Sequence, residues 1–237
     1  MITTTGRHRM SASCGNILNM EIYHILNRGV DKRVVVKNDQ DRMRFLQGLF
    51  MYNDKNTLGR NARRKPSKRR GITQRDLLVN IHAFCLMDNH YHLLLSPIDN
   101  DLTNLSAFMR KVNMGYAKYF NEKYKRTGAL WQGKYKSIHV NNDAHFNYIP
   151  YYIHLNPLDM KFPEWRKGQV ANPKKAIEFL RTYKWSSFLD YQNIKNYPSL
   201  IHTQLLKETT GSIKKQQEDM TKIIQDNSTE LYSNLLE

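Results

Sequence analysis

Apolar residues recur along this chain with two different periods, one typical of strands and one typical of helices. Short apolar runs predict strands at 22–26, 81–87 and 90–96, and residues 131–140 have the alternation of a further extended segment. Between the second and third runs, Asp88 and Asn89 can adopt positive φ, which suits a tight hairpin. Helical spacing predicts helices at 39–52 and 102–124. Strands interleaved with helices predict an α+β fold with helices covering one face of an antiparallel sheet.

The helical segments also predict which residues are buried and where one helix begins and ends. The stripe expected to be buried in the first helix consists of Met43, Phe45, Leu46, Leu49 and Phe50. Asp143 is expected to cap a later helix that contains Tyr148, Tyr151 and Tyr152. Asn156-Pro157 should close that helix, because the residue before a proline avoids the helical region.

Changes in composition divide the chain into three parts. Residues 1–18 are polar and are expected to be a loose N-terminal segment, 19–160 form the main domain, and 161–237 form a C-terminal extension. The first part of the extension, which contains Trp185-Ser186-Ser187-Phe188, is expected to dock on the core. A basic insertion interrupts the main domain at about 54–76, where eight lysines and arginines between Arg60 and Arg75 occur without an acidic residue.

The charge of the chain indicates its class of partner. Lysine and arginine number 37 against 21 acidic residues, a formal net charge of +16. Such an excess attracts polyanions, so nucleic acid is the leading partner, although a basic solvated surface alone would have the same composition. Two distant cysteines favour a reducing compartment, and no segment approaches the roughly 20 apolar residues of a membrane span. We therefore expect a cytoplasmic protein without a membrane partner.

Candidate chemistry begins with the histidines of Met87-Asp88-Asn89-His90-Tyr91-His92-Leu93-Leu94-Leu95. Successive side chains of a strand point to opposite faces, so His90 and His92 project from the same face and can hold one divalent metal ion. A His-x-His pair alone is more often structural than catalytic. Downstream, Tyr152 and Asn156 are four residues apart and share one helix face. The amide oxygen of Asn156 is a hard ligand that suits Mg²⁺ or Mn²⁺.

These motifs resemble the REP-associated tyrosine transposases, a family of single-tyrosine HUH-type transposases. The matching stretches are Tyr23-His24-Ile25-Leu26-Asn27-Arg28-Gly29, the paired-histidine run, Leu130-Trp131-Gln132-Gly133-Lys134-Tyr135-Lys136-Ser137, Tyr152-Ile153-His154-Leu155-Asn156-Pro157 and Trp185-Ser186-Ser187. Together they span roughly residues 20–191. The sequence departs from the family pattern in the basic insertion and in the tail beyond residue 191.

The resemblance implies a fold, a reaction and a set of roles. The fold is a ferredoxin-like antiparallel sheet covered by helices, here with a helical C-terminal extension. His90 and His92 correspond to paired metal ligands, Asn156 to the third ligand, and Tyr152 to the nucleophile. Family members cleave and rejoin single-stranded, hairpin-forming DNA through a 5′-phosphotyrosine intermediate, with Mg²⁺ or Mn²⁺ as cofactor. A monomer and a dimer are both compatible with the sequence.

Basic residues outside these motifs are candidates for DNA contact, and other functions stay open. The phosphate-binding candidates are Arg110, Lys111, Lys134, Lys136, Arg69 and Arg70. Tyr148 lies on the same helix face as Tyr152 and is the second candidate nucleophile, whereas Tyr151 is expected to be a packing residue. The main alternative function is a non-catalytic nucleic-acid-binding module with an RNA-recognition-type sheet. A metal-dependent hydrolase is a third possibility, but the motif lacks acidic residues.

Overall fold

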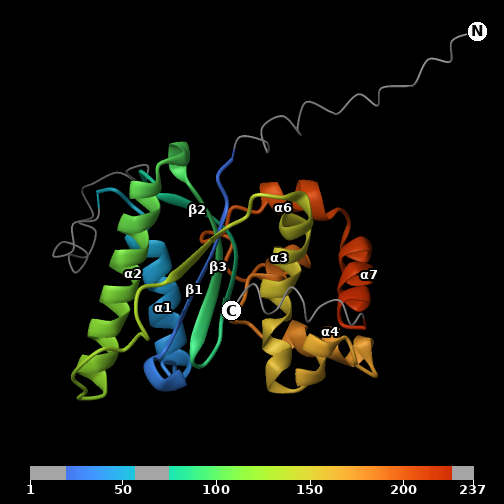
Figure 1. The fold of residues 1–237 in the computed structure, drawn as a ribbon, viewed down its shortest axis with the longest axis horizontal. Coiled ribbons are helices and arrows are strands. Elements are labelled where there is room, and N and C mark those ends of the chain that lie inside the picture. Colours follow the sequence, from blue (N-terminus) through green and yellow to red (C-terminus); the bar gives the residue numbers. More distant parts are fainter. Residues whose placement is uncertain (1–19, 57–74, 226–237) are drawn as a thin grey trace, which may run out of the picture.

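The fold is built around one antiparallel sheet of four strands (Figure 1). The structure, a computed structural model, describes residues 20–56 and 75–225 of the 237-residue chain. The strands are β1 (Tyr23–Arg28), β2 (Val79–Leu86), β3 (His90–Pro97) and β4 (Lys136–His139). Their order across the sheet is β2-β3-β1-β4, and all three neighbouring pairs are antiparallel.

The helices described fall into two groups along the chain. Helices α1 (Asp39–Tyr52) and α2 (Leu102–Lys123) connect β1 to β2 and β3 to β4, respectively. After β4 come α3 (Asp143–Leu155), α4 (Pro173–Thr182), α5 (Phe188–Tyr191), α6 (Gln204–Thr210) and α7 (Ile213–Ile223). Short 3-10 turns are η2 (Val30–Lys32), η4 (Ile98–Asn100), η5 (Asn156–Met160) and η6 (Pro163–Lys167).

The connections give the sheet its ferredoxin-like topology. The chain order is β1-α1-β2-β3-α2-β4, and each helix links two strands that are separated in the sheet by one other strand. The β2–β3 hairpin turns at Met87–Asn89, where the Met87 N–H donates to the His90 carbonyl over 2.8 Å. Neither Asp88 nor Asn89 has positive φ, so the expected turn geometry is wrong although the hairpin forms. The α+β fold class is confirmed.

Helices cover both faces of this sheet, which corrects the expectation of one covered face (Figure 1). Tyr91 points to the side of α1 and α2, where its ring lies 5.0 Å from that of Phe45. His92 points to the opposite side, where its ring lies 5.6 Å from that of Tyr152 on α3. All eight residues of β3 are consequently buried. A central strand buried on both faces needs two helical layers, and the C-terminal helices supply the second one.

The apolar stripe of α1 is narrower than its sequence pattern suggests. Phe45, Leu46 and Leu49 are buried as expected, but Met43 and Phe50 are 42% and 40% exposed. Both exposed residues line a shallow hollow of about 280 Å³ against residues 196–200. The Phe50 ring also lies 4.0 Å from the guanidinium of Arg75. An amphipathic pattern therefore overstated the width of the buried face.

The ends of α3 differ in detail from the expected ones. Its N-cap is Asn142, whose side chain accepts a hydrogen bond from the His145 N–H, and Asp143 is the first helical residue. The α-helix ends at Leu155, before Asn156-Pro157, as expected. Asn156 nevertheless keeps helical angles (φ −49°, ψ −38°), because the chain continues directly into the 3-10 turn η5. This continuation holds Asn156 one turn beyond Tyr152.

The segment around α5 lies along the outer edge of β2. The Leu86 N–H donates to the Trp185 carbonyl and the Ser187 N–H donates to the Phe84 carbonyl, each over 3.0 Å. The Tyr191 hydroxyl donates to the His82 carbonyl over 2.6 Å. These bonds satisfy the backbone groups of an edge strand that would otherwise be available for pairing with another chain.

Candidate active site

The paired histidines and the candidate nucleophile meet between the sheet and α3. His90 and His92 lie on the same face of β3, and their ring centroids are 5.1 Å apart. The Tyr152 ring packs edge-on against His92 at 5.6 Å and against His24 of β1 at 6.1 Å. The structure therefore brings His90, His92 and Tyr152 together from separate elements, as the sequence motifs predict.

Each histidine of the pair uses Nδ1 for a hydrogen bond within the protein. His90 Nδ1 lies 2.6 Å from the Asn89 side-chain oxygen, which can only accept, so the proton of His90 is on Nδ1. His92 Nδ1 lies 2.9 Å from His24 Nε2. Within the described part of the chain, the buried Nε2 of His92 has no hydrogen-bond partner. A nitrogen in that position is suited to a metal ion, because ligating histidines commonly anchor their second nitrogen in this way.

The surroundings of His92 favour its neutral form. Burial is the largest influence and, together with the neighbouring His90 and His24, it lowers the pKa of His92 well below its ordinary value. Burial also lowers the pKa of His24 to about 3, with a smaller contribution from His145. Neutral imidazole is the form that binds metals, so His92 is in the form that a divalent cation requires at physiological pH.

Asn156 lies beside Tyr152, but its side chain is engaged elsewhere. Its amide nitrogen donates to the Tyr152 carbonyl over 2.8 Å, and its amide oxygen accepts from Arg166 Nη2 over 3.3 Å. In the described ranges, no three side chains of His, Cys, Asp or Glu are grouped so that they could hold a metal ion. A third protein ligand would therefore have to be of another type, such as this amide oxygen.

Arg166 of η6 connects the two α3 residues of the site. Its Nη1 donates to the Tyr152 hydroxyl over 3.1 Å, while Nε and Nη2 bind the Asp159 carboxylate over 2.9 and 2.7 Å. Burial alone would lower the pKa of Arg166, but the hydrogen bond with Asp159 and the contact with Tyr152 outweigh it and raise that pKa. A permanently charged guanidinium thus rests against the candidate nucleophile.

A basic cleft opens next to the histidine pair. It has a volume of about 260 Å³, and its lining is Leu26, Asn27, Arg28, His90, His92, Gln132, Gly133, Lys134 and Lys136. Tyr152 does not line this cleft and is 0% exposed. Two of the predicted DNA-contacting residues, Lys134 and Lys136, are therefore close to the candidate metal ligands.

The other predicted DNA-contacting residues are not brought to this cleft. Arg110 and Lys111 are on α2, which packs on the opposite face of the sheet. The Lys111 ammonium donates to the Asp54 carbonyl over 3.1 Å. Arg69 and Arg70 lie outside the described residues.

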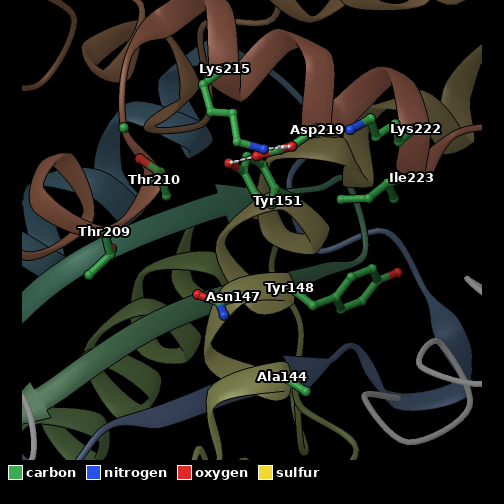
Figure 2. Close-up of a pocket in the computed structure, with 11 residues that line it drawn as sticks. Ala144, Asn147, Tyr148, Tyr151, Thr209, Thr210, Lys215, Asp219, Lys222 and Ile223 are labelled. Atoms are coloured by element: carbon green, nitrogen blue, oxygen red, sulfur yellow. Dashed lines mark hydrogen bonds and ion pairs between the residues drawn. The ribbon is translucent and has the colours of Figure 1, made fainter. Parts of the chain in front are cut away.

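A larger hollow, of about 590 Å³, separates α3 from α6 and α7 (Figure 2). Tyr151 reaches across it and donates its hydroxyl to Asp219 of α7 over 3.1 Å, which agrees with its expected packing role. Tyr148 also lines this hollow, and its ring centroid is 6.0 Å from that of Tyr152. The two tyrosines share a helix face, but Tyr148 borders the hollow whereas the Tyr152 ring packs on His92.

Three residues of the site received no role in it from the sequence. Arg28 ends β1 and lines the basic cleft, and His24 contacts His92 directly. Both lie in a stretch with a strand pattern. Alternation alone places them on one face of that strand, but only the pairing register shows that this is the face of the histidine pair. Arg166 follows Tyr152 by 14 residues in a segment without a recognised motif, so no local signal marked it.

Comparisons with known proteins bear on the family. Residues 58–156 match the family model described as "Transposase IS200 like". That stretch includes His90, His92, Tyr152 and Asn156, and this match supports a transposase role and DNA binding. No curated protein matches the chain. No helix in the described residues is both long and apolar enough to cross a bilayer.

A solved structure is also similar to the chain. It is described as "Structure of the REP associates tyrosine transposase bound to a REP hairpin" and is 14% identical, with a TM-score of 0.44. The match covers 86% of this chain and 93% of that chain. The family-model match, which spans both the histidine pair and Tyr152, agrees with the resemblance to tyrosine transposases carried by the sequence motifs.

Proposed function

We propose that this protein is a metal-dependent transposase that cleaves and rejoins single-stranded, hairpin-forming DNA through Tyr152. The observation that carries the proposal is the contact of the Tyr152 ring with His92, at 5.6 Å, in a cluster that also contains His90. A hydrolase that activates water would not need a tyrosine at this position. A covalent transesterification does, because the tyrosine hydroxyl is itself the attacking group.

The reaction transfers a phosphodiester from deoxyribose to tyrosine. The Tyr152 oxygen attacks phosphorus, the new O–P bond forms, and the bond from phosphorus to the 3′ oxygen breaks. The hydroxyl proton of Tyr152 passes to water, and the 3′ oxygen takes up a proton from water and departs as a hydroxyl. The 5′ end stays bound as a phosphotyrosine, so a second 3′-hydroxyl can reverse the step without an external energy source.

His90, His92 and Asn156 would hold the divalent cation, Mg²⁺ or Mn²⁺. When bound, such a cation polarises a non-bridging phosphate oxygen and neutralises its charge. The neutral state of His92 and the anchored Nδ1 atoms of both histidines support this assignment. Asn156 can serve as a ligand if its oxygen, which has two lone pairs, is shared with Arg166 or released by it.

The chain's own basic groups supply the remaining binding energy. Lys134, Lys136 and Arg28 line the cleft beside the histidines and can bind the phosphates that flank the scissile one. Arg166 holds the Tyr152 hydroxyl, and its guanidinium can stay with that oxygen as the phosphotyrosine forms. Because Tyr152 is fully buried here, DNA can reach its hydroxyl only after the side chains around it move. We therefore infer that the conformation with Tyr152 buried is the one before DNA binds.

The proposal is tested on a denaturing gel. The protein is mixed with single-stranded hairpin oligonucleotides labelled at either end, with Mg²⁺ or Mn²⁺ and with EDTA as the control. We expect a covalent adduct that forms only with the cation. It should carry the 3′-end label, because the fragment downstream of the cut stays attached to the protein through its 5′ phosphate. Cut ends without an adduct would indicate a metal-dependent hydrolase instead.

One observation favours a second candidate function, a non-catalytic DNA-binding module. Tyr152 is fully buried and its hydroxyl is hydrogen-bonded to Arg166, which is compatible with a purely structural tyrosine. Binding to the same oligonucleotides with neither adduct nor cleavage, at every cation and DNA concentration tried, would select this function.

A further inference from the structure

His24 of β1 is completely buried against the candidate metal site. Its Nε2 lies 2.9 Å from His92 Nδ1, and the two rings are nearly parallel, with centroids 5.1 Å apart and an interplanar angle of 13°. The strand register explains the contact, because His24 pairs with Leu94, the second residue after His92 on the same face. The sheet therefore fixes this histidine beside one of the two candidate ligands.

A hydrogen bond between two neutral imidazoles contains a single proton. Two lone pairs at 2.9 Å would repel each other, and two N–H groups would clash, so one ring donates and the other accepts. If His24 donates, His92 must carry its own proton on Nε2 and cannot bind a cation there. If His92 donates from Nδ1, its Nε2 presents a lone pair. Only the second arrangement is compatible with a metal ion.

We propose that His24 is the positioning residue that selects the metal-binding tautomer of His92 and fixes the orientation of its ring. The inference rests on the proposed function, because it requires His92 to be a ligand. His24 does not itself touch the cation. It accepts the Nδ1 proton of His92, and this leaves Nε2 as the ligating atom.

Comparison with other buried histidines separates this role from ordinary packing. His82 has a serine and a carbonyl as partners, Ser96 Oγ at 2.9 Å and the His202 carbonyl at 3.3 Å. His154 has Ser187 Oγ at 2.8 Å. His24 Nδ1, in contrast, is buried without a hydrogen-bond partner in the described part of the chain. A buried polar atom left unsatisfied costs stability, so a purely structural site would favour an apolar residue over His24.

The test is a calorimetric titration of the full chain with Mn²⁺ alone, without DNA. His24→Phe keeps an aromatic ring in the stack and removes both nitrogens, whereas His24→Gln keeps an acceptor oxygen. We expect His24→Phe to weaken Mn²⁺ affinity by about 10–100-fold and His24→Gln to retain most of it. The matched control is His82→Gln, a buried histidine of β2, which should bind Mn²⁺ as the wild type does.

Thermal unfolding without metal provides a second measurement. His24→Phe removes the unsatisfied Nδ1 of His24 but leaves His92 Nδ1 without its partner, so the two effects on stability oppose each other. A cooperative unfolding transition establishes that the variant is folded when its Mn²⁺ affinity is compared with that of the wild type. If His24→Phe fails to fold, His24→Leu takes its place in both measurements. Mn²⁺ affinity equal to that of the wild type in His24→Phe, or equal losses in His24→Phe and His24→Gln, would overturn the inference.

A further variant separates failure of this inference from failure of the proposed function. His92→Ala should abolish Mn²⁺ binding at this site. If His92→Ala binds Mn²⁺ as tightly as the wild type, the metal assignment of the proposed function is wrong. If His92→Ala loses binding but His24→Phe does not, only the role of His24 is wrong.

Discussion

The Arg166 guanidinium donates a hydrogen bond to the Tyr152 hydroxyl over 3.1 Å. The two residues lie on different elements, η6 and α3, and Asp159 holds the guanidinium in place through two further bonds. An arginine fixed in this way can orient the attacking oxygen and later bind the phosphate attached to it. This contact links the segment after residue 160 to the proposed nucleophile on α3.

The first prediction concerns this arginine. Arg166→Ala should slow adduct formation by roughly 100–1000-fold, the usual cost of removing one positioned donor from a reacting oxygen. Quenched time courses of adduct formation at saturating DNA measure the effect. Arg181→Ala, which removes an exposed arginine of α4, is the control and should leave the rate unchanged. Equal rates for Arg166→Ala and the wild type would show that the contact has no part in the reaction.

The second prediction distinguishes the two groups of basic residues. The double variant Lys134→Glu, Lys136→Glu changes the cleft beside the histidines, whereas Arg110→Glu, Lys111→Glu changes α2 on the other face. We expect the first to flatten the slope of log affinity against log salt by about 0.7–0.9 for each DNA phosphate that the variant no longer neutralises. The second should change it less. Fluorescence anisotropy over a salt series measures both, and the reverse order would mean that DNA follows α2 instead.

The third prediction concerns the stability of the fold at low pH. Burial lowers the pKa of His24 and of His154 to about 3, and that of His82 to about 4. The unfolded chain, with ordinary histidine pKa values of 6.5, takes up protons first as the pH falls. Stability is therefore complete above about pH 6.5 and decreases below it, by roughly 2 kcal/mol per such histidine at about pH 5.

Urea unfolding at about pH 7.5 and about pH 5 measures this dependence. His154→Gln, which removes one of the titrating groups, should reduce the difference between the two pH values. An unfolding free energy that does not change between them would contradict the neutral state assigned to these buried histidines.

The fourth prediction tests the packing of α1 on α2. A Cβ atom added at Gly115 would lie 2.6 Å from two carbon atoms of the Tyr52 ring, so Gly115→Ala must displace that ring. We expect a loss of about 1–3 kcal/mol in the free energy of unfolding. Gly48→Ala is the matched control, since its Cβ would meet the same ring at an ordinary 3.6 Å. Calorimetry should show destabilisation for Gly115→Ala alone.

The local sequence pattern predicts where the helices and strands of this fold lie, but it does not predict which other elements cover them. Helix α1 has the expected bounds, and β3 and α3 lie where the apolar runs and Asn156-Pro157 indicate. Met43 and Phe50 were wrongly expected to be buried, because helical periodicity cannot show how wide a face the neighbouring elements cover. The second helical layer was missed for a related reason, since it comes from chain segments far from the strands they cover.

The candidate site divides in the same way. The sequence spacing predicts two pairs of neighbouring side chains. His90 and His92 are two residues apart on one strand, and Tyr152 and Asn156 are one helical turn apart. The contact of Tyr152 with the histidine pair, between the sheet and α3, depends on tertiary structure, and only the family resemblance indicated it. The contact of Arg166 with Tyr152 joins residues from elements with no regular spacing between them. No period could have predicted that contact.

The most direct test of the central claim is to map the covalent DNA adduct to a residue. The wild type is incubated with hairpin DNA and Mn²⁺, digested, and analysed by peptide mass spectrometry, with Tyr152→Phe and Tyr148→Phe in parallel. The assignment of Tyr152 as the nucleophile predicts a nucleotide on Tyr152, no adduct for Tyr152→Phe despite normal DNA and metal binding, and an adduct for Tyr148→Phe. A nucleotide on Tyr148 or Tyr151, or an undiminished adduct in Tyr152→Phe, would contradict it.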